Sequence, residues 1–154
     1  MTIEKQSPST RPAPVPDQAS RPFFDAAAEG RLLIRYCPAC ARYLAPAADF
    51  CDTCHAGALE WRQASGRATL YSFVINHQVL HPGFAAEVPF NVIIAELAEG
   101  PRLTGNYIGE NTDLEVNMAL QVTFEQVSDV SVPKWRAALD EPRVGTNEPS
   151  SEDP

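Results

Sequence analysis

The sequence has 154 residues and a formal net charge of −8, which suits one compact domain or two very small ones that share a core. Acidic residues outnumber basic ones within residues 21–140 as well. An acidic surface repels phosphate backbones, which argues against a nucleic-acid partner. No apolar run reaches the roughly 20 residues that a membrane-spanning helix needs, and the N-terminus lacks the basic and apolar regions of a secretory signal. We therefore expect a cytoplasmic protein that does not contact a membrane.

Both ends of the chain are rich in proline and poor in large apolar side chains. Residues 1–20 and residues 141–154 share this composition. Such segments cannot bury enough apolar surface to offset the entropy of ordering. We therefore expect a disordered tail over residues 1–20, a disordered acidic tail over residues 141–154, and a folded part from about residue 21 to about residue 140.

A short helix is predicted over residues 21–31. Ser20 is a candidate N-cap, and Gly30 is a plausible C-terminal stop. Phe23 and Phe24 belong to an apolar stripe at helical spacing. These two rings can pack on the domain or dock on a partner, and spacing alone favours packing.

The rest of the chain predicts strands. Short apolar pieces at residues 32–36 and 59–61 flank the cysteines and predict a small ribbon. Beyond Gly66, β-branched and aromatic residues or period-2 alternation predict longer strands. These strands cover residues 68–80, 90–97, 102–108, 120–125 and 131–135. Four or five antiparallel strands of this kind fit a small closed barrel. We expect the helix and ribbon within residues 21–64 and the barrel within residues 65–140.

All four cysteines form two C-x2-C pairs, Cys37 with Cys40 and Cys51 with Cys54, with ten residues between the pairs. Two thiolates three positions apart fit on one tight turn, and two facing turns form the tetrahedral sulfur cage that zinc prefers. Disulfides are disfavoured in a reducing cytoplasm, and a redox pair would not need a second pair. Iron fits the same cage. Because four protein ligands leave no open coordination position, we expect a structural metal.

The residue after each cysteine pair is Ala41 or His55. Turns of this kind often need a positive φ at that point, which glycine adopts most easily. Histidine tolerates this region somewhat better than alanine. We therefore expect local strain or a variant turn at Ala41.

Several stretches of the chain, in this order, resemble a family of acyl-CoA-associated proteins. The stretches are FFDAAAEGRLLIRYCPAC, CDTC, LEWRQASGRATLYSFVI, VPFNVIIAEL with AEGPRL, and LQVTFEQ. Members of the family join an N-terminal helical hairpin and a rubredoxin-like zinc ribbon to an OB-fold barrel. The resemblance covers about residues 21–135. It implies a mainly β chain, in which an N-terminal helix and a zinc ribbon pack on a small five-stranded OB-fold barrel.

The resemblance also implies a role as an accessory subunit. Its relatives look like partners of thiolase-fold enzymes, steroid side-chain aldolases or hot-dog-fold hydratases that act on CoA thioesters. The partner would supply the catalytic residues, so the chain is expected to be a required, non-catalytic part of a hetero-oligomer. It would stabilise that partner and help shape the channel for the CoA arm or acyl group. Two departures are Ala41 in place of the usual glycine and the absence of an arginine from LAPAADF before the third cysteine.

Six residues are candidates for contact with CoA, the acyl group or the partner: Phe23, Phe24, Arg62, Arg67, His81 and Phe84. The two arginines bracket the ribbon–barrel junction and offer forked donors to phosphates, although a solvated charge or a surface salt bridge is favoured for both. Phe84 lies in a loop over residues 81–89, where it fits a lid or acyl contact as well as an ordinary buried position.

Two other classes of function stay open. Single-stranded nucleic-acid-binding modules also use OB barrels and zinc ribbons, but they need a basic groove with exposed stacking aromatics. A stand-alone enzyme would need His77 or His81 as an acid–base group near neutral pH. No serine or cysteine nucleophile accompanies these histidines in a matching pattern. A barrel or surface role is therefore favoured for both.

Overall fold

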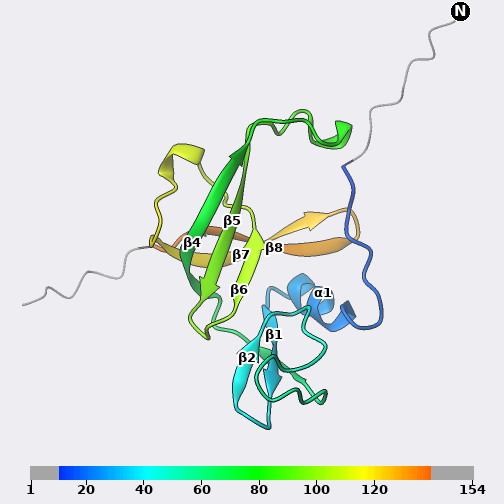
Figure 1. Ribbon diagram of the computed structural model, residues 1–154. Helices are drawn as coiled ribbons and strands as arrows, with labels where there is room; N and C mark the ends of the chain where they lie inside the picture. Colours follow the sequence, from blue (N-terminus) through cyan, green and yellow to red (C-terminus); the bar gives the residue numbers. More distant parts are fainter. Residues whose placement is uncertain (1–10, 140–154) are drawn as a thin grey trace, which may run out of the picture.

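The computed structural model describes residues 11–139. A helix comes first, a small ribbon follows, and a five-stranded barrel completes the described chain (Figure 1). The elements are α1 Arg21–Ala28, β1 Leu33–Cys37, β2 Arg42–Leu44, β3 Glu60–Gln63, β4 Arg67–Asn76, β5 Phe90–Leu97, β6 Arg102–Gly105, β7 Ala119–Val127 and β8 Val130–Ala137, with short 3-10 turns η1 Pro82–Phe84 and η2 Asn111–Asp113. The predicted mainly β fold is confirmed.

The barrel is an antiparallel sheet with the strand order β6-β5-β4-β7-β8. Its two outer strands meet where Tyr107, just after β6, forms a parallel bridge with Trp135 of β8. Two backbone hydrogen bonds support this seam: the Ile108 N–H donates to the Trp135 carbonyl at 2.7 Å, and the Trp135 N–H donates to the Asn106 carbonyl at 2.9 Å. Closure of this kind removes exposed sheet edges, and it confirms the predicted five-stranded barrel.

The ribbon is a second sheet with the order β2-β1-β3, and it shares one core with the barrel. Leu32 and Ile34 from the ribbon pack in the same buried cluster as Leu70, Ile93 and Trp135 from the barrel. Ile34 has no exposed surface, so its burial alone contributes on the order of 2 kcal/mol. The ribbon therefore cannot move freely relative to the barrel without opening this core.

Helix α1 lies between the ribbon and the barrel and packs against β8 (Figure 1). It buries Ala26 and Ala27. The helix ends earlier than the predicted residue 31 because Gly30 adopts φ +75. The N–H groups of Gly30 and Arg31 then donate back to the carbonyls of Ala27 and Ala26, a common helix-ending arrangement. No helix among the described residues is long and apolar enough to cross a membrane.

Two strands end earlier than predicted, whereas β7 and β8 each extend one or two residues beyond the predicted bounds at both ends. β5 has the predicted bounds, but β4 stops at Asn76 instead of continuing to residue 80. The Asn76 side chain bonds both backbone groups of Gln78, and such a local turn competes with strand pairing. β6 stops at Gly105 rather than residue 108, because the chain there leaves β5 to close the barrel against β8.

The structure describes residues 11–20, the second half of the predicted N-terminal tail. From Arg11 onward the chain has defined contacts, among them ion pairs of Arg11 with Glu87 and Glu125 and hydrogen bonds between Asp17 and Ser20. Charged side chains and a turn, rather than apolar burial, hold residues 11–20. The predicted tail over residues 141–154 and the first ten residues lie outside the described part.

Gly66 and Gly30 provide a matched test of packing at the ribbon–barrel junction. Their φ values are +76 and +75, but a Cβ at Gly66 would lie 2.5 Å from Cγ1 of Val122, whereas a Cβ at Gly30 would meet nothing within 4 Å. Gly30→Ala should lower the free energy of unfolding only by the cost of a left-handed alanine, about 1–2 kcal/mol. Gly66→Ala should lower the free energy of unfolding by about 1–3 kcal/mol more, because overpacking adds to that cost.

Urea denaturation followed by circular dichroism measures both free energies of unfolding. Equal losses in the two variants would show that the junction relaxes around the added methyl group without cost.

Candidate functional site

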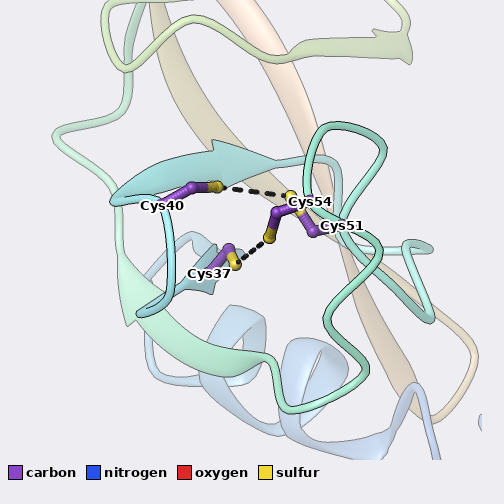
Figure 2. A group of neighbouring side chains, drawn as sticks. All are labelled: Cys37, Cys40, Cys51 and Cys54. Carbon is purple, nitrogen blue, oxygen red and sulfur yellow. Dashed lines mark hydrogen bonds between the residues drawn. The ribbon is translucent and has the colours of Figure 1, made fainter.

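The four cysteine sulfurs lie together at the end of the ribbon (Figure 2), all within 4.8 Å of one another. The Sγ atoms of Cys37 and Cys54 are 3.5 Å apart, and so are those of Cys40 and Cys51. A disulfide would place them at about 2.05 Å. In contrast, four ligands at about 2.3 Å from a tetrahedral zinc ion have sulfurs roughly 3.8 Å apart. The geometry therefore matches a metal-binding cage and excludes disulfides between these pairs.

Two tight turns bring the sulfurs together. Cys37 ends β1, Cys40 precedes β2, and Cys51 and Cys54 lie in the loop between β2 and β3. In the second turn the N–H of His55 donates to the carbonyl of Cys51 at 3.0 Å. In both turns, the residue after the second cysteine adopts the left-handed backbone conformation.

That residue is Ala41 in the first turn, with φ +56, and His55 in the second, with φ +59. The positive φ expected at these positions is confirmed. Alanine has a Cβ that crowds the backbone in this region at a cost of roughly 1–2 kcal/mol. The first turn is therefore strained at Ala41, as expected, and the gathered sulfurs must offset this strain.

Burial of the cage is graded. Cys37 and Cys51 have no exposed surface, whereas Cys40 is half-buried and Cys54 is exposed. Leu44 is the other buried member of this small cluster. So few apolar side chains cannot stabilise a ribbon by themselves, since small units of this size usually need disulfides or metals.

The thiols respond unequally to their surroundings. Backbone N–H groups of Cys54 and Thr53 lower the pKa of the Cys51 thiol to about 6. Burial and the neighbouring sulfurs raise the pKa of the Cys40 thiol to about 12. The thiolate form of Cys51 is thus stabilised, whereas ionisation of Cys40 is opposed. A divalent cation at the centre supplies the positive charge that allows the remaining sulfurs to ionise.

Three of the other predicted contact residues come together. Phe23 and Phe24 from α1 and Phe84 from η1 line one mainly apolar groove of about 490 Å³. The loop that contains Pro46 and the outer strands β6 and β8 complete its walls. We call this the aromatic groove. Phe23 also packs on the core, so the packing role and a lining role coexist.

His81 lies beside Phe84 of this groove. Its ring centre is 6.1 Å from that of Phe84, and its Nδ1 accepts a hydrogen bond from the Gly83 N–H at 3.0 Å. The histidine therefore caps the 3-10 turn η1. His77 follows the end of β4 and is exposed.

The two arginines predicted near CoA phosphates do not converge. Arg62 stacks over the Tyr36 ring at 3.4 Å and pairs with Glu60 at 3.0 Å. Arg67 starts β4 and faces a different hollow, beside β7 and the end of β8. A single phosphate site formed by both residues is not supported by this arrangement.

Two of the three cations that line the aromatic groove share one carboxylate, and this pair was missed from the sequence. Arg11 and Lys134 both line it, and both pair with Glu125, at 3.6 Å and 2.8 Å respectively. Arg11 was assigned to a disordered tail, and a lone lysine in a strand gives no signal of its partner. Their position could not be found without the barrel register that places β8 beside β7.

A helix, a four-cysteine ribbon and a closed five-stranded barrel in one chain define a protein that joins a metal ribbon to an OB-type barrel. Two family models match these parts in the same order. Residues 24–60 match the rubredoxin-like zinc ribbon domain of ChsH2, and residues 61–125 match its C-terminal OB-fold domain. The chain belongs to this ChsH2-type family, also called DUF35.

Solved structures agree with the assignment. The chain of an Ltp2-ChsH2(DUF35) aldolase matches with a TM-score of 0.72 and 29% identity, over 82% of this chain and 100% of that chain. A DUF35 protein of unknown function from Sulfolobus solfataricus matches with a TM-score of 0.57 and 14% identity, over 79% of this chain and 86% of that one. The second match supports the fold alone.

Relatives of known description include two hydratase subunits. A probable enoyl-CoA hydratase alpha subunit of Thermomonospora curvata is 31% identical over 88% of this chain and 43% of its own length. The 3-oxo-4,17-pregnadiene-20-carboxyl-CoA hydratase alpha subunit of Mycobacterium tuberculosis is 34% identical over 47% of this chain and 23% of its own length. A DUF35 domain-containing scaffold protein of Methanocaldococcus jannaschii is 25% identical over 60% of this chain and 67% of its own length. This chain spans less than half of each hydratase subunit.

Replacement of one ligand tests the cage. Cys51→Ser should release the metal and unfold the ribbon, because a structural four-sulfur site contributes on the order of 10 kcal/mol to folding. Thr53→Ala is the matched control, since it removes an exposed side chain from the same turn and keeps all four sulfurs. Elemental analysis of metal per chain and circular dichroism measure the two effects. Full metal content in Cys51→Ser would contradict a four-cysteine site.

A second test concerns pH and Glu125, the carboxylate that pairs with Arg11 and Lys134. The hydrogen bond from Lys134 holds the pKa of Glu125 below its ordinary value, and the charge of Arg11 acts in the same direction. This stabilisation is complete above the unfolded pKa of about 4.5 and is lost as the pH falls through the lower folded value. Because the pair is partly exposed, its contribution is at most about 1 kcal/mol.

The difference in unfolding free energy between the wild type and Glu125→Gln should therefore be constant from pH 6 to 8, about 1 kcal/mol, and shrink toward zero in stronger acid. A difference that grows on acidification would contradict this assignment. Comparing the two proteins at each pH cancels the effect of acid on the cysteines.

Proposed function

We propose that this chain is a non-catalytic accessory subunit of an acyl-CoA-processing complex. The observation that carries the proposal is the fold match to the DUF35 chain of an aldolase, because this chain covers all of that one. In the proposed complex, a thiolase-fold partner, either a thiolase or an aldolase, holds the catalytic residues. The complex acts on a CoA thioester in the cytoplasm, and this chain stabilises the partner and helps shape its CoA or acyl channel.

The proposed metal is zinc, held by Cys37, Cys40, Cys51 and Cys54. The sulfur spacing suits zinc, and the ribbon matches a family named for it. Iron fits a four-sulfur cage as well, so metal analysis of the purified chain decides between them. The ion would pin the ribbon beside the barrel and would take no part in the reaction.

The arrangement of titratable groups supports a non-catalytic role. Among residues 11–139, the four cysteines are the group of potential metal ligands that the fold gathers. All four are consumed by the cage, which leaves no thiol as a nucleophile. His81 caps a turn, and the exposed His77 belongs to no such group. Acyl transfer or carbon–carbon cleavage needs a nucleophile or base beside an oxyanion site, and we assign these groups to the partner.

A second candidate is a subunit of a hot-dog-fold acyl-CoA hydratase. The likeness to two hydratase alpha subunits favours it. Both candidates share the substrate class, a CoA thioester, and they differ in the partner and the reaction. Water addition to an enoyl-CoA changes absorbance at the conjugated double bond, whereas thiolysis or aldol cleavage releases two carbonyl-containing products.

Co-expression with a thiolase-like protein encoded beside this chain tests the proposal. We expect a stable complex on size-exclusion chromatography and an activity on an acyl-CoA that needs both chains. Cys51→Ser should lose the complex, and Thr53→Ala should keep it. The isolated chain should be inactive.

The proposal fails if the partner purifies as a soluble and fully active enzyme that ignores this chain. Hydration of an enoyl-CoA by a complex with a hot-dog-fold protein would select the second candidate.

A further inference from the structure

The cysteines of the cage differ in their access to solvent. Cys54 is the exposed one of the four. Its neighbours Asp52, Thr53 and His55 are exposed as well, so the outer side of this turn faces water. In contrast, Cys37 has no exposed surface. A small solute in water therefore reaches the sulfur of Cys54 before the sulfur of Cys37.

Metal binding makes this exposed sulfur reactive. A cysteine binds a metal ion as the thiolate, so the cage keeps Cys54 deprotonated at neutral pH. The thiolate is the nucleophilic form of cysteine, and the oxidation of a cysteine follows its thiolate character and its exposure. Cys54 has both properties, whereas the buried sulfurs of Cys37 and Cys51 have only the first.

A second sulfur lies close to that of Cys54. The Sγ atom of Cys54 is 3.5 Å from the Sγ atom of Cys37 on the facing turn (Figure 2). Residues 45–59, which connect β2 to β3 and contain Cys54, form no helix or strand. A small shift of Cys54 therefore breaks no hydrogen bond of a sheet, while Cys37 is held at the end of β1. This arrangement favours a disulfide across the two turns over a disulfide within one Cys-x2-Cys motif.

We infer that Cys54 is a site of oxidation by peroxide, and that Cys37 resolves its oxidised form. The Cys54 thiolate attacks one oxygen of hydrogen peroxide, the O–O bond breaks, hydroxide leaves and a sulfenic acid forms on Cys54. The Cys37 thiolate then attacks this sulfur, the S–O bond breaks, a second hydroxide leaves and the disulfide forms. The two thiolates supply the two electrons that reduce the peroxide. This inference does not depend on the proposed acyl-CoA function.

Oxidation at this site removes two of the four metal ligands. Only the sulfurs of Cys40 and Cys51 then remain, and a structural ion needs four ligands. The metal is therefore released. Leu44 is the one other buried member of the cluster around the sulfurs, so the ribbon loses its packing with the metal. A thiol reductant, supplied together with the metal, should restore it, because a disulfide is reversible by exchange.

Full-length protein loaded with zinc tests the order of these events. Hydrogen peroxide is added, a zinc-binding dye records the released metal, and a thiol reagent counts the remaining cysteines. Zinc release should follow the loss of two thiols per chain. Dimedone, which labels sulfenic acids, should label Cys54 before any other cysteine. Circular dichroism should show that the reductant and zinc together restore the native spectrum.

Peptide mapping without a reductant identifies the disulfide. Trypsin cleaves after arginine, which separates the two cysteine pairs into the peptides of residues 36–42 and residues 43–62. A disulfide across the turns links these two peptides, whereas a disulfide within one motif does not. Fragmentation of the linked peptides in a mass spectrometer should show Cys37 joined to Cys54 in the first product.

Two histidine substitutions separate reactivity from metal binding. Histidine is a zinc ligand in Cys3His sites, so Cys54→His and Cys40→His each keep four ligands. Cys54→His removes the reactive sulfur, and peroxide should release its zinc at least about tenfold more slowly than from the wild type. Cys40→His is the matched substitution, because it keeps Cys54 and Cys37, and peroxide should still join them. Elemental analysis and circular dichroism verify that each variant holds zinc and is folded.

Several results would overturn the inference. One is dimedone labelling that begins at Cys37 or Cys51, and another is a first disulfide within one turn. Wild-type protein that keeps its zinc and all its thiols in excess peroxide would contradict it too, as would zinc release from Cys54→His at the wild-type rate. If a histidine variant holds no zinc, the labelling and mapping of the wild type decide by themselves.

Discussion

The fold depends on four sulfur atoms that lie within 4.8 Å of one another. The ribbon that they close has only Leu44 beside Cys37 and Cys51 as a fully buried cluster, too little to stabilise a separate unit. Once closed, however, the ribbon presents Leu32 and Ile34 to the barrel core. The same closure fixes the loop after β2, whose Pro46 forms a wall of the aromatic groove. The four-sulfur cage in the ribbon therefore helps to hold the wall of the aromatic groove.

Much of this arrangement could be predicted from the sequence. The cysteine spacing determined the cage because two tight turns leave few other uses for four thiols. The apolar run of β5 was placed with its correct ends, and the left-handed positions of Ala41 and His55 followed from the geometry of the turn. These features are local, or they depend on residue types that have few alternatives.

The remaining features depend on contacts between distant segments. Asn76 ends β4 through its own side chain, which a pattern of apolar residues does not reveal. Arg11 is held by carboxylates from two other parts of the chain, so its surroundings exist only after the barrel has formed. Arg62 and Arg67 are near in sequence but face different surfaces, because the chain passes from one sheet to the other between them.

The two tryptophans of the chain divide between its two parts. Trp135 lies at the barrel seam with 1% of its surface exposed, whereas Trp61 lies in the ribbon beneath the guanidinium of Arg35, 3.8 Å from the ring centre. An indole sealed in an apolar core emits at shorter wavelength than one near water and a cation. The protein therefore contains two tryptophan fluorophores with different emission wavelengths, one in each sheet. Their separate responses can distinguish a molecule that has lost only its ribbon from one whose barrel has opened.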